Sequence, residues 1–138
     1  MNRRITKLIG ATALAMAVGF PLFSSPARAG GSIGFYLSPR TAQDAEALDL
    51  GLRAYSLYSG LRSGASVRQL GWNNYAGIGQ TGGGNLGIIR QQGSGHSATL
   101  RQNGNDNSYG IFQFGRNTDT SVVQSGSGQS GAALLFGW

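Results

Sequence analysis

The chain has 138 residues, a formal net charge of +6 and no cysteine. This length leaves room for one domain of ordinary size, and the lack of cysteine excludes a disulfide framework. Such a domain has to be stabilised by packing, by backbone hydrogen bonds or by assembly.

Residues 1–29 have the pattern of a secretory signal peptide. Basic residues lie within the first seven positions, an apolar run follows over residues 8–20, and Ala27-Arg28-Ala29 has the small-x-small pattern of a cleavage site. The apolar run is shorter than the about 20 residues that a membrane-spanning helix needs. We therefore expect residues 1–29 to be removed during export.

Removal of this segment changes the charge of the chain. Four of the eleven basic residues lie in it, so seven arginines and five acidic residues remain, with a net charge of +2. The basicity of the full chain thus comes mostly from the targeting segment. It gives little support for specific nucleic-acid binding.

Residues 30–62 do not repeat, and they contain one predicted helix. Thr41 followed by Asp44 is typical of a helix N-terminus. Apolar residues then recur at helical spacing, namely Ala45, Leu48, Leu52 and Tyr55, with Leu57 and Tyr58 widening the stripe. We expect a short amphipathic helix to about Tyr58, either as a cap over the first edge of the following domain or as a recognition segment.

Residues 63–138 repeat with a period of eleven. Glycine recurs at positions 71, 82, 93, 104, 115, 126 and 137. The position two residues earlier holds Gln69, Gln80, Gln91, Gln102, Gln113, Gln124 and then Leu135. An apolar column holds Val67, Ile78, Ile89, Leu100, Ile111, Val122 and Ala133. A small-residue column holds Ala65, Ala76, Gly87, Ala98, Tyr109, Thr120 and Gly131, and a polar column holds Ser63, Asn74, Asn85, His96, Asn107, Thr118 and Gln129.

The spacing within one unit indicates a β-strand. Asn74, Ala76, Ile78 and Gln80 are two residues apart, so they share one face of a strand. Glycine, asparagine and aspartate between the strands are typical of turns. We therefore predict an all-β fold, a β-solenoid of eleven-residue strand-turn units with two units per coil, preceded by a short α-helix.

In such a solenoid, strands 22 residues apart stack, and the inner faces of two sheets pack together. The apolar column is then the predicted core: Val67, Ile78, Ile89, Leu100, Ile111 and Val122. The polar columns are predicted to form amide ladders along the axis: Gln69, Asn74, Gln80, Asn85, Gln91, Gln102, Asn107, Gln113 and Gln124. An unpaired buried amide costs about 1–3 kcal/mol, so each side chain needs its neighbours.

The unit Gln69-x-Gly71-x-x-Asn74-x-Ala76-x-x-x-Gln80 resembles the repeat of the curlin family, the subunits of curli fibres. The resemblance covers about residues 63–138 and implies an amyloid subunit secreted through a dedicated outer-membrane pore of a Gram-negative bacterium. It implies homopolymer fibres in the biofilm matrix, and as partners another curlin subunit, the pore and its accessory proteins. As an alternative to a cap, the helix segment is then a recognition element for that pore or for a partner subunit. Major subunit and nucleator are not distinguished.

Catalytic chemistry is not expected, and neither is a cofactor or a metal. His96 is the lone histidine and stands in the asparagine column, which indicates a ladder substitute, while Asp106 and Asp119 lie in or beside turns. We therefore predict that the chain is not an enzyme. A monomeric β-solenoid module that binds glycans or ice is the alternative from another class.

Two surface features carry further expectations. Arg68, Arg90 and Arg101 each precede a ladder glutamine and should point outward, for solubility or as a stripe that binds anionic matrix polymers. The last unit, with Leu135, Phe136 and Trp138, has no charge and no proline. We expect it to be an exposed docking edge for the first unit of another copy, or alternatively a cap folded over the core.

Overall fold

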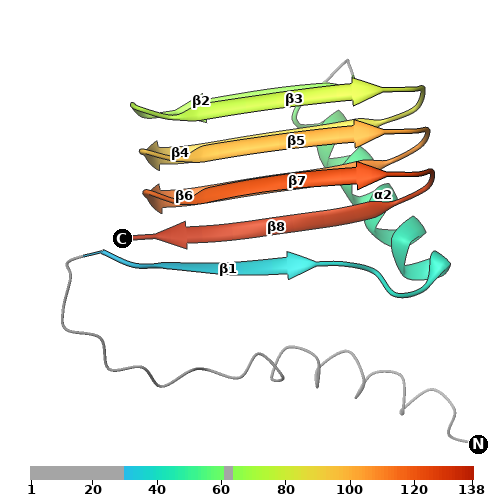
Figure 1. The fold of residues 1–138 in the computed structure, drawn as a ribbon, viewed down its shortest axis with the longest axis horizontal. Helices are drawn as coiled ribbons and strands as arrows, with labels where there is room; N and C mark the ends of the chain where they lie inside the picture. The colour runs from blue at the N-terminus through green and yellow to red at the C-terminus, as the bar shows by residue number, and fades with distance from the viewer. Residues whose placement is uncertain (1–29, 61–63) are drawn as a thin grey trace, which may run out of the picture.

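The computed structural model describes residues 30–60 and 64–138, so the predicted signal peptide and the boundary at residues 62 and 63 lie outside the described residues. The chain forms one strand, one helix and then a stack of strands (Figure 1). The elements are β1 (Ser32–Leu37), α2 (Ala42–Tyr58), β2 (Ala65–Leu70), β3 (Tyr75–Thr81), β4 (Leu86–Ser94), β5 (Ser97–Asn103), β6 (Ser108–Arg116), β7 (Asp119–Ser125) and β8 (Ser130–Gly137).

The repeat folds as a β-solenoid with two units per coil. Strands β2, β4, β6 and β8 pair in parallel in one sheet, which we call sheet A, and β3, β5 and β7 pair in parallel in sheet B. Each residue lies beside the one 22 positions later, as Ile89 beside Ile111 and Leu100 beside Val122. The predicted fold, including the preceding helix, is confirmed.

The glycine column has a steric cause. Gly104 has a φ of 124°, in the left-handed region that favours glycine, and a Cβ at this position would overlap the carbonyl of Gly126 in the next coil. The backbones of stacked turns approach each other this closely because the coils are in register. A side chain at these positions would therefore push two coils apart.

The core lies between the inner faces of the two sheets. Ile89, Leu100 and Ile111 are at most 2% exposed, and Ile78 and Val122 are partly buried against them. Val67 is 45% exposed, so its prediction as a core residue is wrong. It lies in β2, which has a neighbour on one side only, and no coil of the described chain covers it.

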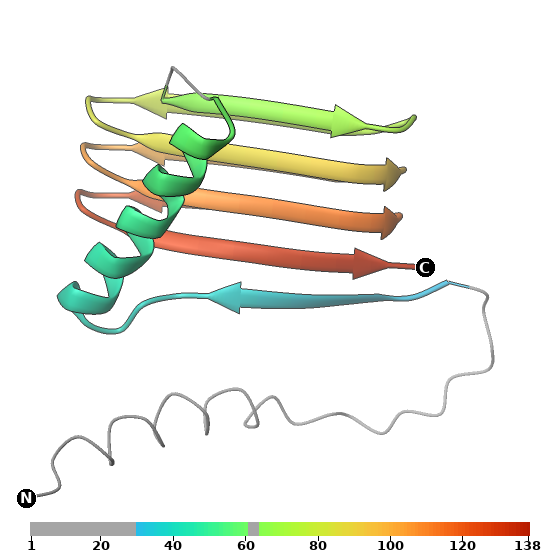
Figure 2. The ribbon, with the colours of Figure 1, turned by 180° about the vertical axis from the view of Figure 1, so that it is seen from behind.

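Helix α2 lies across the outer face of sheet A (Figure 2). Thr41 is its N-cap, and its hydroxyl accepts a hydrogen bond from the backbone N–H of Asp44, as predicted. The expectation that the segment covers the first edge of the solenoid is wrong. Leu52 is instead buried against Leu86 and Ile88 of β4.

Other residues of the predicted stripe divide between buried and exposed positions. Leu48 and Tyr55 pack against the same cluster, whereas Leu57 and Tyr58 are exposed and do not widen it. The ring of Tyr55 meets that of Phe112 edge-on, with centroids 5.6 Å apart. In the part of the chain that the structure describes, no helix has the length and apolarity to cross a membrane.

Strand β1 covers the last strand of the repeat. It pairs antiparallel with β8, with Gly34 opposite Leu135 and Tyr36 opposite Ala133, and it lies at the end of sheet A in both views (Figures 1 and 2). The expectation that the last unit is an exposed edge is therefore wrong. The alternative, a cap made by the last unit itself, is wrong as well, because the cap comes from residues before the helix.

Tyr109 takes a place that other units fill with a small residue. It is 7% exposed, and its neighbours in sheet A, one coil away on each side, are Gly87 and Gly131. A Cβ at Gly131 would overlap the Tyr109 ring, so this glycine makes room for it. Burial raises the pKa of Tyr109 above its usual value, with a smaller contribution from Tyr36.

We predict that Gly131→Ala destabilises the monomer by about 1–3 kcal/mol, because the added methyl overpacks the core beside Tyr109. In the Tyr109→Ala background the same substitution has space and should not destabilise. Urea unfolding of the four members of this double-mutant cycle measures the coupling. Equal effects of Gly131→Ala in both backgrounds would show that Tyr109 is not the group it displaces.

Candidate functional site

Two glutamine ladders run along the solenoid axis. In sheet A the Nε2 of Gln69 donates to the Oε1 of Gln91, and Gln91 donates in the same way to Gln113, both at 2.8 Å. In sheet B, Gln80 donates to Gln102 and Gln102 to Gln124, both at 2.7 Å. The side chains of Gln91, Gln102 and Gln113 are fully buried.

The three fully buried ladder glutamines also tie the two sheets together. The Nε2 of Gln91 in sheet A donates to the carbonyl of Tyr75 in sheet B at 2.7 Å, and that of Gln102 in sheet B donates to the carbonyl of Leu86 in sheet A at 3.1 Å. Both amide hydrogens are thus satisfied. This cross-sheet bond spans 16 residues, an interval that the spacing of identical residues does not reveal.

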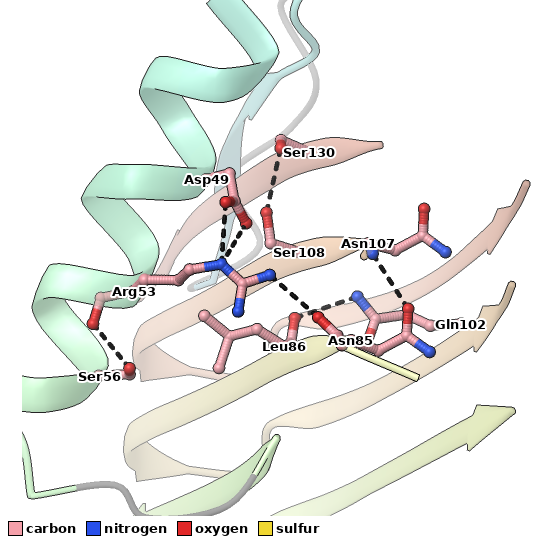
Figure 3. Close-up of polar contacts among 10 residues, drawn as sticks. Asp49, Arg53, Ser56, Asn85, Leu86, Gln102, Asn107, Ser108 and Ser130 are labelled. Carbon is pink, nitrogen blue, oxygen red and sulfur yellow. Dashed lines mark hydrogen bonds and ion pairs between the residues drawn. The ribbon is translucent and has the colours of Figure 1, made fainter. Parts of the chain in front are cut away.

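The asparagine column does not form an amide ladder, so this part of the prediction is wrong. The Nδ2 of Asn85 donates to the carbonyl of Gly104 at 2.8 Å, and its Oδ1 accepts from the backbone N–H of Asn107 at 3.0 Å (Figure 3). Asn107 bonds Gly126 and Gln129 in the same way, and Asn74 bonds Gly93 and His96. Short side chains at the strand start reach the backbone of the next turn rather than each other.

His96 fills an asparagine position with different partners. Its ring is 1% exposed, with Nδ1 2.7 Å from the Thr118 hydroxyl and Nε2 3.2 Å from the carbonyl of Gln92. Thr118 is the residue one coil later in the same column, so the two substitutions satisfy each other. Among the described residues, no three His, Cys, Asp or Glu side chains gather into a group that could hold a metal.

The predicted outward arginines differ in their surroundings. Arg68 and Arg101 are exposed, whereas Arg90 is partly buried beside α2 and donates from Nη1 to the Tyr55 hydroxyl at 3.0 Å. Arg90 is therefore not a free surface charge, because the helix covers this part of sheet A. Partial burial raises the pKa of Tyr55, but the hydrogen bonds from Arg90 and Ser59 and the nearby Arg90 and Arg68 charges outweigh it, and the pKa is lowered.

The helix is also fixed by a polar contact at its middle. Arg53 forms an ion pair with Asp49 at 2.8 Å, and its Nη2 donates to the carbonyl of Gly84 in a solenoid turn at 2.9 Å (Figure 3). The pair is partly exposed, so its contribution to stability is small. It does orient Arg53 toward the turn.

The two ends of the solenoid are unlike. At the N-terminal end β2 and β3 each have a neighbour on one side only, and Val67 and Tyr75 there are 45% and 63% exposed. At the C-terminal end β7 has a free edge in sheet B, while the edge of β8 in sheet A is covered by β1. Free strand edges carry unpaired N–H and C=O groups, which are templates for another strand.

Comparison with known proteins agrees with this geometry. Residues 84–115, which span β4, β5 and most of β6, match the family model of the curlin-associated repeat. The chain contains a curlin-associated repeat. No curated protein and no solved structure matches the chain. The matched residues contain Gln91, Gln102 and Gln113, the fully buried ladder glutamines.

We predict that Gln102→Ala destabilises the monomer by about 2–4 kcal/mol, because it leaves a cavity and takes a partner from Gln80, Gln124 and the Leu86 carbonyl. The neighbouring Arg101→Ala removes only an exposed charge and should change stability by less than about 0.5 kcal/mol. Urea unfolding of freshly prepared monomer compares the two. If Arg101→Ala destabilised the monomer and Gln102→Ala left its stability unchanged, the assignment of the inner face would be wrong.

Proposed function

We propose that this chain is a structural subunit of an extracellular curli-like amyloid fibre that polymerises at the cell surface. The observation that carries the proposal is a solenoid of stacked, in-register coils that leaves strand edges free at both ends. The coils inside the chain already have the cross-β arrangement, with parallel strands perpendicular to the stacking direction and glutamine ladders along it. Another copy can extend the same hydrogen-bond pattern.

The surroundings of the free edges support assembly over a monomeric role. Proteins that stay monomeric usually blunt such edges with charge, proline or a covering element. Here the N-terminal end presents exposed apolar side chains, among them Val67 and Leu70 of β2 and Trp72 of the turn before β3. A second copy that covers this end would bury apolar surface and pair backbone groups together.

Export and location belong to the same proposal. The signal-peptide pattern of residues 1–29 and the curlin repeat together support secretion to the outside of the cell. The partners we propose are further copies of the chain, a second curlin subunit and a curli-type secretion pore with its accessory proteins. We propose no catalytic activity.

The test is polymerisation of the purified chain from Gly30 onward. We expect thioflavin-T-positive fibres whose diffraction shows strands about 4.8 Å apart along the axis and sheets about 10 Å apart. A chain that stays monomeric and folded for days at micromolar concentration would contradict the fibre proposal and favour a monomeric binding module. A chain that polymerises only after seeding by a second curlin would support the same role with a separate nucleator.

A further inference from the structure

The C-terminal end of the solenoid is closed in one sheet and open in the other. In sheet A, β8 pairs with β6 on one side and with β1 on the other. In sheet B, β7 pairs with β5 only. A recess of about 530 Å³ lies at this end, lined by Val122 and Gln124 of β7 and by residues 38–41 of the β1–α2 connection.

Strand β1 departs from the pattern of every other strand. It is antiparallel to its neighbour, whereas all other strand pairs of the described chain are parallel. All six of its residues are exposed, and none belongs to either buried cluster. Phe35 and Tyr36 are 51% and 58% exposed. The backbone ladder, extended by the mutual bonds of Gly31 and Trp138, is therefore the main attachment of β1.

The repeat itself defines which strand continues this end. The units alternate between the two sheets, and the last one, β8, lies in sheet A, so the next unit belongs in sheet B beside β7. The repeat therefore places β2 of a second copy beside β7 and its β3 beside β8. In sheet B the ladder then continues, because Gln124 is the last donor and the Oε1 of Gln69 accepts no hydrogen bond from the described chain. The apolar column continues too, with Val67 of the second copy beside Val122.

In sheet A the same docking places β3 of the second copy on the edge that β1 now occupies. Ile78 of the second copy would lie beside Ala133, where Tyr36 now lies, and Gln80 would lie beside Leu135. The ladder of sheet A already ends one strand earlier, since Gln113 donates to the carbonyls of Ser97 and Thr118. Docking at β8 therefore breaks no existing amide pair.

We propose that the edge of β8 docks β3 of a second copy, and that β1 is an autoinhibitory strand that occupies this edge until then. The proposal rests on the proposed function. β2 of the incoming copy can pair with β7 directly, whereas its β3 reaches β8 only when β1 leaves. The connection of residues 38–41 lets β1 leave while α2 stays on sheet A. Release of β1 is thus a step of elongation, and it keeps the exported monomer from growing at this end.

The test is a reversible lock between β1 and β8. Phe35 and Leu134 are opposite each other in the antiparallel pair, and the chain has no cysteine of its own. In the double variant Phe35→Cys/Leu134→Cys, opposite positions are close enough for a disulfide. We expect the oxidised variant to elongate wild-type seeds at no more than about one tenth of the wild-type rate, because each copy that it adds leaves a closed end. Reduction should restore the rate.

The matched control is Thr99→Cys/Ser121→Cys, a pair on the outer face of β5 and β7 whose hydroxyls are 2.8 Å apart. This staple crosses two strands without touching β1, so its oxidised and reduced forms should elongate alike. Equal elongation of the oxidised and reduced β1–β8 variant would overturn the proposal. Failure of the wild-type chain to form any fibre would instead overturn the proposed function, which makes the two failures distinguishable.

Discussion

A buried primary amide has to be paired at both its oxygen and its nitrogen, and this requirement governs the solenoid. Gln91 and Gln102 lie in a core from which water is excluded, and each finds its partners in the coil one period away and in the opposite sheet. A shift of one residue between coils would turn the glutamines outward and break both sets of bonds. The register in turn brings the turn backbones so close that only glycine fits there.

Where the repeat departs from its consensus, neighbours one coil away compensate. His96 bonds Thr118, and Tyr109 lies between Gly87 and Gly131. Leu135, which ends the glutamine column, lies opposite Gly34 of β1. These substitutions occur in pairs because a stacked column transmits any change of size or polarity directly to the next layer. The strand that covers the last unit thus presents no side-chain amide to Leu135.

The parts of the fold that sequence reasoning could predict are those that repeat. The period of eleven and the two-residue spacing are enough to predict which strand residues face inward and that strands 22 residues apart stack. Thr41 is a local signal for the helix start. The bonds of Asn85 to backbone, and of Gln91 across the sheets, depend on how far each side chain reaches in three dimensions. The spacing of residues in the repeat does not give such distances.

The pairing of β1 with β8 could not be predicted from the sequence for a related reason. The alternation of Ile33, Phe35 and Leu37 is compatible with a strand, but residues 32–37 occur once and share no column with the repeat. Their partner β8 lies about a hundred residues away and runs in the opposite direction. The position of α2, and with it the partial burial of Arg90, follows from tertiary packing on Leu86 and Ile88, which look like ordinary outward positions of a strand.

The placement of α2 has a consequence at the scale of a filament. Sheet A carries the helix on its outer face, whereas the outer face of sheet B carries polar groups such as the Thr99–Ser121 hydroxyl pair and the Arg101 guanidinium. Each subunit contributes seven units, an odd number, so a filament that continues both sheets turns each copy by half a turn relative to the one before. The helices then alternate between the two flanks, with flat hydrophilic stretches between them. Close side-by-side bundling of such filaments requires the helices of one filament to fit between those of its neighbour.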